Sequence, residues 1–93
     1  MKIFIQSNFV VPGLDGKEVL ELEATEIKLR DFLEELSSRA PMRIEYIRNG
    51  IIDPDEWEIE VNGIPYSKCK EGLDTLLKDN DQVTIKIMAL GGG

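Results

Sequence analysis

Apolar and polar residues alternate with a period of two along four segments of the chain, and each segment predicts a β-strand with one buried face. These segments cover residues 2–10, 19–23, 57–61 and 82–88. The first two are separated by residues 12–16, which include one proline and two glycines and therefore predict a turn. We expect the chain to open with a hairpin of two antiparallel strands.

The period changes to that of a helix after residue 28. Apolar residues then recur at i, i+3, i+4 and i+7 on one helical face; they are Leu29, Phe32, Leu33 and Leu36. Charged and polar residues occupy the opposite face. This pattern predicts an amphipathic helix that begins near Lys28 and ends before Pro41, because a proline disfavours helical geometry at the residue before it.

Turn-forming residues divide the second half of the chain. Residues 42–56 contain several of them and predict an irregular connection. Asn62 and Gly63 form the dipeptide that most strongly indicates a tight hairpin turn. Pro65 lacks an N–H donor, which favours an edge position in a sheet. Residues 67–75 predict a loop with a helical turn.

Leucines and aromatic residues complete the predicted core. Leu73, Leu76 and Leu77 are expected to seal its rim, and residues 78–81 predict a polar turn. Most aromatic residues lie at positions expected to be buried; the six are Phe4, Phe9, Phe32, Tyr46, Trp57 and Tyr66.

Together these elements predict an α+β fold in which a mixed sheet packs on one main helix. Residues 1–90 would form a single domain, and residues 91–93 a flexible C-terminal glycine tail, because glycine loses the most backbone freedom when it is ordered. If the last strand pairs beside the first in the centre of the sheet, the two strands are parallel. The tail would then follow a rigid, buried element.

The net charge of the chain limits the classes of molecule that it is expected to bind. Its 93 residues include 18 acidic and 11 basic side chains, a net charge of −7. Nucleic acid and anionic membrane surfaces would repel such a chain, whereas a basic protein would attract it. The sequence has no apolar run of membrane-spanning length and no signal-like start, and Cys69 has no second cysteine with which to form a disulfide. We therefore expect a cytoplasmic protein with no nucleic-acid or membrane partner.

The side chains offer little catalytic chemistry. Cys69 has no histidine to activate it, because the chain contains none, and a zinc site is disfavoured for the same reason. The acidic residues at 34–35 and 53–56 lack the spacing of a catalytic pair or a calcium loop, and we interpret them as solvated surface. We expect a chain that is not an enzyme and binds no metal or cofactor.

The chain ends in Gly91, Gly92 and Gly93, where the only reactive group is the terminal carboxyl of Gly93. A carboxylate is ionised at pH 7 and is a poor electrophile. Acyl chemistry there requires activation, most simply by ATP through an acyl-adenylate. Glycines have no Cβ, so such a tail can enter a narrow channel and leave its carbonyl open to a nucleophile. The alternative interpretation is a frayed end without function.

Three motifs follow one another along the chain: residues 60–65 with a Val-Asn-Gly turn, residues 76–83 with an acidic turn into the last strand, and the terminal Gly92 and Gly93. In this order they resemble the MoaD/ThiS family of ubiquitin-like sulfur carrier proteins. The helix sequence at 29–36 is also similar to that of the family. The resemblance covers essentially the whole chain and implies a β-grasp fold.

The resemblance also implies a mechanism. A ubiquitin-activating-type adenylating enzyme (MoeB/ThiF-like) would use Mg-ATP to adenylate the C-terminal glycine, and a sulfur donor would convert it to a thiocarboxylate. Gly93 would be the reacting terminus, while Leu90, Gly91 and Gly92 would enter the partner. Apolar residues near the last strand would dock there. Chain length and the connection at 41–56 favour the MoaD branch, the small subunit of molybdopterin synthase, whose partner is the large subunit.

Two departures from the family pattern leave alternatives open. Asn80 stands where the family has a turn glycine, although asparagine also tolerates left-handed backbone. The tail has three glycines, so either Gly93 or, after trimming, Gly92 is the mature terminus. The alternatives are a sulfur carrier for thiamine or tRNA thiolation, a ubiquitin-like modifier that forms an isopeptide with a target lysine, and a β-grasp interaction module with an inert tail.

Overall fold

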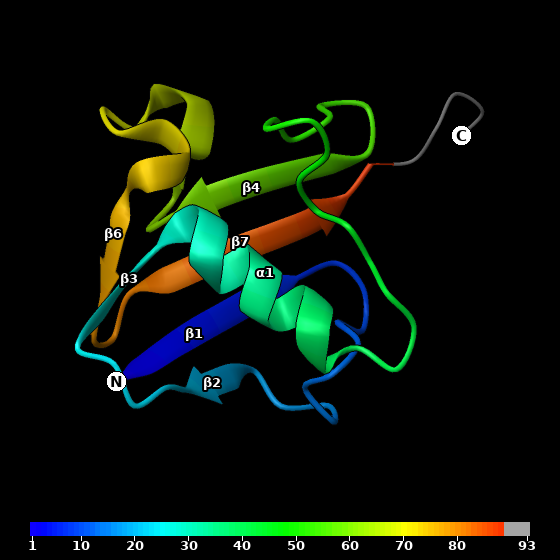
Figure 1. The fold of residues 1–93 in the computed structure, drawn as a ribbon, viewed down its shortest axis with the longest axis vertical. Coiled ribbons are helices and arrows are strands. Elements are labelled where there is room, and N and C mark those ends of the chain that lie inside the picture. The colour runs from blue at the N-terminus through cyan, green and yellow to red at the C-terminus, as the bar shows by residue number, and fades with distance from the viewer. Residues whose placement is uncertain (89–93) are drawn as a thin grey trace.

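A computed structural model describes residues 1–88 of the chain (Figure 1). Its elements in chain order are β1 (Lys2–Ser7), β2 (Val19–Glu21), β3 (Glu26–Lys28), α1 (Leu29–Arg39), β4 (Trp57–Val61), β5 (Ile64–Pro65), two short 3-10 helices (Tyr66–Lys68 and Gly72–Asp74), β6 (Leu76–Lys78) and β7 (Gln82–Ile87).

Five strands form one mixed sheet in the order β2-β1-β7-β4-β5. The first and last strands lie side by side and parallel, with Ile5 beside Val83, and the other pairings of this sheet are antiparallel. The predicted opening hairpin and the predicted parallel pair are both confirmed, and Pro65 lies on an edge strand as expected. Because β7 lies between β1 and β4, the strand that leads to residue 88 is supported on both sides.

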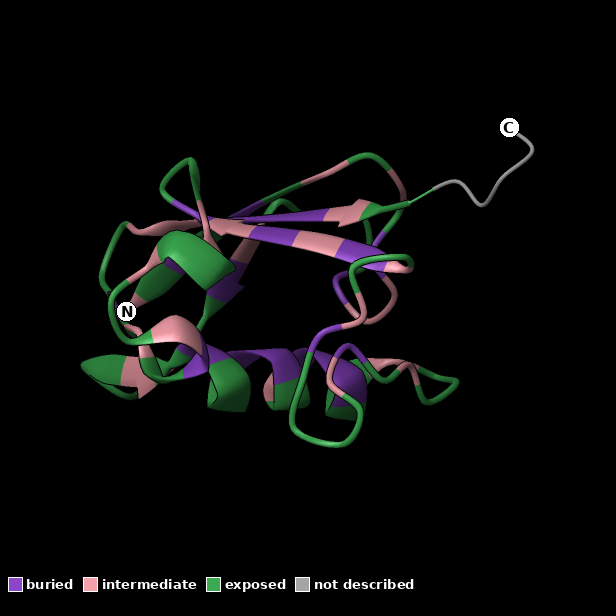
Figure 2. Cartoon of the chain, turned by 90° about the horizontal axis from the view of Figure 1, so that it is seen from above, coloured by how far each residue is buried: buried purple, intermediate pink, exposed green. Residues whose placement is uncertain are grey.

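α1 crosses one face of the sheet, and the two layers enclose the core (Figure 2). The four apolar helix residues predicted to be buried are each at most 1% exposed; they are Leu29, Phe32, Leu33 and Leu36. Ile3, Ile59 and Ile85 face them from the sheet and are equally buried. The predicted α+β arrangement, a mixed sheet packed on one main helix, is confirmed.

A second sheet, in which β3 pairs antiparallel with β6, does not follow from the sequence pattern. Each of its strands has three residues, too few for alternation to be distinguished from a loop. Leu77 is completely buried by this pairing, but Leu76 is 45% exposed. The expectation that Leu76 seals the core is wrong, because successive side chains of a strand point to opposite faces.

Three turns use left-handed backbone at asparagine: Asn49, with a φ of 53°, lies between α1 and β4, and Asn62 and Asn80 lie in turns between strands. Asn62 and Gly63, with φ of 50° and 84°, connect β4 to β5 in the predicted hairpin turn. Asn80 has a φ of 71° and replaces the expected glycine without loss of the turn. The Asp81 carboxylate holds this turn, because it accepts the Lys78 N–H at 2.8 Å.

Phe4 is an exception to the predicted aromatic core. It lies on the outer face of the sheet, opposite Val19 and beside Gln82, and is 42% exposed.

The first strand is shorter than predicted, because β1 ends at Ser7 rather than near residue 10. The chain turns there, and the Ser7 hydroxyl donates a hydrogen bond to the Phe9 carbonyl at 2.6 Å.

The connection between α1 and β4 is irregular, as predicted, apart from one β-bridge between Arg48 and Ile51. Two of its residues, Tyr46 and Ile52, are nevertheless buried in the core at 2% exposure. These residues anchor the connection next to the end of the sheet where β4 begins.

Candidate functional site

The residues predicted to do the chemistry lie outside the described part of the chain; they are Leu90, Gly91, Gly92 and Gly93. The structure describes the chain up to Met88, one residue beyond the end of β7. Ile87 and Met88 are therefore the root of the predicted tail. The candidate site is built from this root and from the residues that hold it.

Hydrogen bonds hold the backbone of the root on both sides. The Ile87 N–H donates to Asn8 Oδ1 at 2.9 Å, and Asn8 Nδ2 donates to the Ile87 carbonyl at 3.1 Å. From the opposite side, the Glu56 carbonyl accepts the Met88 N–H at 2.9 Å. The regular pairing of β1 with β7 ends where Ser7 lies beside Ile85, and the Asn8 side chain continues the hydrogen bonding to β7 beyond that point. The chain is fixed as far as residue 88.

Aromatic rings pack next to the root. Trp57 lies opposite Ile87 in the register of β4 and β7. Its ring centroid is 4.7 Å from that of Tyr46 and 5.6 Å from that of Phe9, in edge-on and tilted geometries that aromatic pairs favour. Burial raises the pKa of Tyr46 to about 12, so its hydroxyl, already neutral at physiological pH, stays neutral well into the alkaline range. The root therefore rests on a packed and uncharged support.

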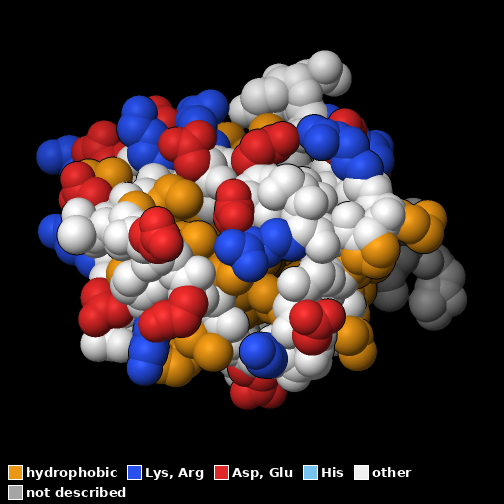
Figure 3. Space-filling model, turned by 60° about the horizontal axis from the view of Figure 1, so that its bottom comes forward, with side chains coloured by type: hydrophobic (Ala, Val, Ile, Leu, Met, Phe, Trp, Pro, Cys, Tyr) orange, Lys and Arg blue, Asp and Glu red, His pale blue; other side chains and the backbone are white. Residues whose placement is uncertain are grey.

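The side chains of the root are apolar and partly exposed. Ile87 is 48% exposed and Met88 is 38% exposed. Hydrophobic side chains gather beside the point where the described chain ends (Figure 3). Such side chains bury area when a partner covers them. Docking of a partner on apolar residues near the last strand stays a prediction.

The acidic residues considered for catalysis or metal binding make surface contacts instead. Glu34 pairs with Arg43 at 3.1 Å, and both side chains are more than 60% exposed. Asp53 accepts the Asp55 N–H at 2.8 Å, which is the geometry of an Asp-initiated turn. Within residues 1–88, no three side chains of the metal-binding types converge on one point.

Cys69 has the surroundings of a structural cysteine. It is half-buried, and its Sγ lies 3.6 Å from the Pro65 carbonyl oxygen and 3.9 Å from that of Ile64. These are weak S–H contacts to the backbone, as expected of a thiol that packs like a small apolar side chain.

Within residues 1–88, no helix is long and apolar enough to cross a membrane.

Asn8 and Glu56 belong to the site but cannot be recognised from the sequence. Asn8 occupies a polar position near the end of the first alternating segment, where any polar residue fits the pattern. Glu56 contributes a backbone carbonyl, which no side-chain pattern can indicate. Only the placement of β7 between β1 and β4 brings both residues to the root.

No protein-family model matches the sequence, and no curated protein matches it significantly. Solved structures do match over nearly the whole chain. HVO 2177 from Haloferax volcanii, solved in solution, gives a TM-score of 0.69 and is 20% identical, over 99% of this chain and 87% of that chain. Small archaeal modifier protein 1 (SAMP1) from Methanosarcina acetivorans gives a TM-score of 0.64 and is 25% identical, over 98% of this chain and 96% of that chain.

These similarities confirm that the chain has a ubiquitin-like β-grasp fold. They do not connect it specifically with the MoaD/ThiS sulfur carriers. That finer assignment, and the roles of Gly93, Gly92, Gly91 and Leu90, stay predictions.

Proposed function

We propose that this chain is a ubiquitin-like protein modifier whose C-terminal carboxyl is activated and then joined to an amine of another protein. The observation that carries the proposal is its structural similarity, over 98% of its length, to a protein named as a small archaeal modifier. The terminal Gly91, Gly92 and Gly93 supply the unhindered carboxyl that such a reaction needs.

The geometry of the root supports this role. Transfer of an acyl group requires the reacting carboxyl to be delivered to another protein's active site in a defined geometry. Asn8 and Glu56 fix the backbone at Ile87 and Met88, so the residues that follow have a defined starting point. The exposed apolar side chains of the root offer the surface on which the activating enzyme would dock.

The proposed reaction has two steps, and both take place on partner enzymes. In an adenylating enzyme of the ubiquitin-activating type, the Gly93 carboxylate attacks the α-phosphorus of Mg-bound ATP, which gives an acyl-adenylate and releases pyrophosphate. A lysine amine of the target then attacks the carbonyl carbon and loses a proton, and AMP leaves as the bond between carbon and the AMP oxygen breaks. This chain contributes the acyl group, and the catalytic groups belong to its partners.

The sequence motifs favour a second candidate, a sulfur carrier for molybdopterin, thiamine or tRNA thiolation. The turn at Asn62 and Gly63 and the turn at Asn80 have the geometry that the resemblance to sulfur carriers implies. Activation would be the same, but a sulfur nucleophile would replace the amine and leave a thiocarboxylate on Gly93. The structural neighbour's name favours an amine acceptor, so we place the modifier first.

The experiment expresses the chain with an N-terminal epitope tag in its native cell, beside a matched variant that lacks Gly92 and Gly93. We expect the full-length chain to give tagged bands above its own mass on a denaturing, reducing gel, and the shortened chain to give none. Bands that persist in the shortened chain, or their absence from both, would contradict the modifier role. A mass gain equal to one sulfur-for-oxygen exchange on the free chain, without such bands, would favour the sulfur carrier.

A further inference from the structure

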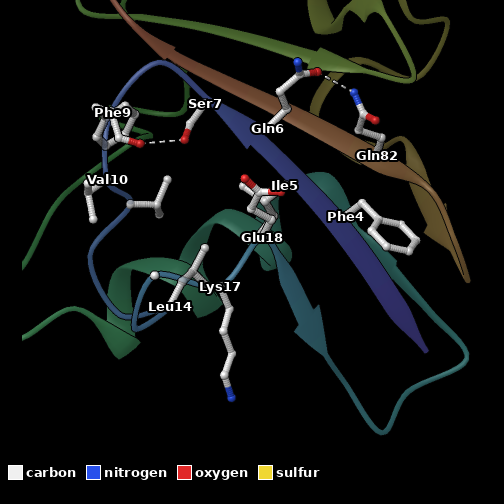
Figure 4. Close-up of a pocket in the computed structure, with 12 residues that line it drawn as sticks. Phe4, Ile5, Gln6, Ser7, Phe9, Val10, Leu14, Lys17, Glu18 and Gln82 are labelled. Atoms are coloured by element: carbon white, nitrogen blue, oxygen red, sulfur yellow. Dashed lines mark hydrogen bonds between the residues drawn. The ribbon is translucent and has the colours of Figure 1, made fainter.

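The opening hairpin separates soon after it begins and leaves a slot beside β1. The regular pairs of β2 with β1 run from Lys2 opposite Glu21 to Phe4 opposite Val19, and the last backbone bond beyond Phe4 joins the Ile5 N–H to the Glu18 carbonyl. Beyond these pairs the connection moves away from the strand. A cavity of about 580 Å³ opens there, lined by β1, residues 9–11, residues 14–18 and Gln82 of β7 (Figure 4). This volume lies within the usual range for binding pockets, roughly 300–1,000 Å³.

Backbone hydrogen-bonding groups of β1 face this slot. In β1 the odd-numbered residues direct their N–H and C=O groups away from β7, as shown by the bond from the Ile5 N–H to the Glu18 carbonyl at 2.8 Å. Ile5 does not receive the reciprocal bond from Glu18 within the described chain, and Ser7 makes no backbone hydrogen bond with any residue from 8 to 18. The Ile5 carbonyl and the backbone groups of Ser7 are therefore open to another strand, whereas the Ile5 N–H is already bonded to Glu18.

The packing of the connection keeps the slot open. Val11 and Leu14 are buried in the core at 5% and 6% exposure, which draws the connection away from β1. Gly13, with a φ of 92°, packs so closely on the end of α1 that a Cβ would lie 2.8 Å from the Arg39 backbone. Closing the slot would require these contacts to break, so it is part of the folded structure.

The floor of the slot is apolar, but polar and charged side chains also line the slot: Gln6, Ser7, Lys17, Glu18 and Gln82. Ile5, Val11 and Leu14 form the floor and are at most 6% exposed. Phe4 and Val10 stand on the rim and are 42% and 79% exposed. An inserted strand would hydrogen-bond to β1 and bury alternate side chains on this floor, which is the geometry of β-strand addition.

The charges near the slot indicate the chemistry of its occupant. Lys17 and Glu18 are the charged residues that line the slot, and they balance each other, whereas Asp15 and Glu21 nearby in the sequence are acidic and the whole chain has a net charge of −7. A basic segment is attracted by this surface. A second copy of the chain, also at −7, is repelled. The chain's own residues 89–93 include three glycines, which have no side chains to cover the floor.

We propose that this slot binds an extended, basic segment of a partner protein with alternating apolar residues, as an added strand beside β1. The open edge of β1 lies on the side away from β7, and the slot is also lined by Gln82 of β7 and by Phe9, which packs on Trp57 beside the root. The proposal goes beyond the modifier role and does not depend on which nucleophile Gly93 meets.

The test uses the full-length chain labelled with nitrogen-15 and a blocked hexapeptide of alternating lysine and valine. We expect saturable binding with the largest amide shift at Ser7, together with slower hydrogen exchange of that amide. The same peptide with glutamate in place of lysine should bind about tenfold more weakly or worse, because the charges then repel.

Two matched variants locate the site. Val10→Lys on the rim and Met42→Lys outside the slot alter side chains that are 79% and 78% exposed, so neither should disturb folding. We expect Val10→Lys to weaken binding of the lysine peptide about tenfold, and Met42→Lys to change it less than about twofold.

Several outcomes would overturn the proposal. One is no shift at millimolar peptide; another is a shift centred on the β5 edge or the outer sheet face; a third is equal weakening by both variants. A Ser7 shift that depends on protein concentration without peptide would assign the slot to a second copy. A Ser7 shift on deletion of residues 89–93, again without peptide, would assign it to the chain's own C-terminus.

Discussion

At the scale of single residues, Asn8 has the most direct effect on the candidate site. Its side chain satisfies both backbone groups of Ile87, at 2.9 and 3.1 Å. We predict that Asn8→Ala lowers the free energy of unfolding by about 1 kcal/mol and speeds hydrogen exchange of the Ile87 amide. The control is Gln6→Ala, which removes an exposed bond to Gln82 at 2.8 Å. If Ile87 exchanges equally fast in both variants, Asn8 does not hold the root.

Gly13 sets the position of the β1–β2 connection. Its φ is 92°, and a Cβ there would lie 2.8 Å from Arg39 backbone atoms, whereas Gly16, with a φ of 78°, has open space around it. We predict that Gly13→Ala lowers the free energy of unfolding by about 2–3 kcal/mol, because strain and a steric clash combine. Gly16→Ala should cost about 1 kcal/mol from strain alone. Equal losses in urea denaturation would show that the contact with Arg39 does not matter.

At the scale of elements, α1 is the clearest link between sequence and core. Leu33 is 1% exposed and faces the sheet layer. We predict that Leu33→Asp lowers the free energy of unfolding by more than about 4 kcal/mol, because it buries an unpaired charge. Leu33→Met, which conserves volume, should cost less than about 1.5 kcal/mol. A Leu33→Asp variant with native circular dichroism and near-native stability would show that this helix face is assigned wrongly.

The elements that the sequence predicts are those with a sustained period. The helix from Leu29 to Arg39 and the strand from Trp57 to Val61 each repeat their pattern long enough to be read. β3 and β6 have three residues each, so Leu76 was expected inside although the strand turns it outward. In strands this short, the pairing with a strand far away in the sequence decides which side chains are buried. Alternation of apolar and polar residues does not reveal that pairing.

The same limit applies to the candidate site. The glycine run at residues 91–93 can be read from the sequence, because its composition is distinctive, but its role stays a prediction. The support at Asn8 and the carbonyl of Glu56 cannot, because β7 must first be placed between β1 and β4. The slot beside β1 is also hidden in the sequence, since the turn residues at 12–16 predict a hairpin but not how far its two arms separate.

At the scale of the whole molecule, buried Tyr46 links stability to alkaline pH. Burial raises its pKa from 10.0 to about 12, so the folded chain keeps the proton after the unfolded chain has lost it. This contribution is fully present below pH 10 and is lost as pH rises from about 10 to about 12. We predict that Tyr46→Phe removes this part of the alkaline loss of stability. The two chains should then be compared by urea denaturation at several pH values, and identical curves would contradict the assignment.

The central claim is that Gly93 becomes linked to an amine of another protein. Lys86 is the last basic residue, so trypsin would leave residues 87–93 as a branch on the modified lysine. We would digest proteins co-purified with the tagged chain from its native cell and search by mass spectrometry for peptides with this branch. The account predicts lysine peptides that carry Ile-Met-Ala-Leu-Gly-Gly-Gly and are absent from cells with the chain that lacks Gly92 and Gly93. A complete absence of branched peptides, with the free chain ending in a thiocarboxylate, would contradict it.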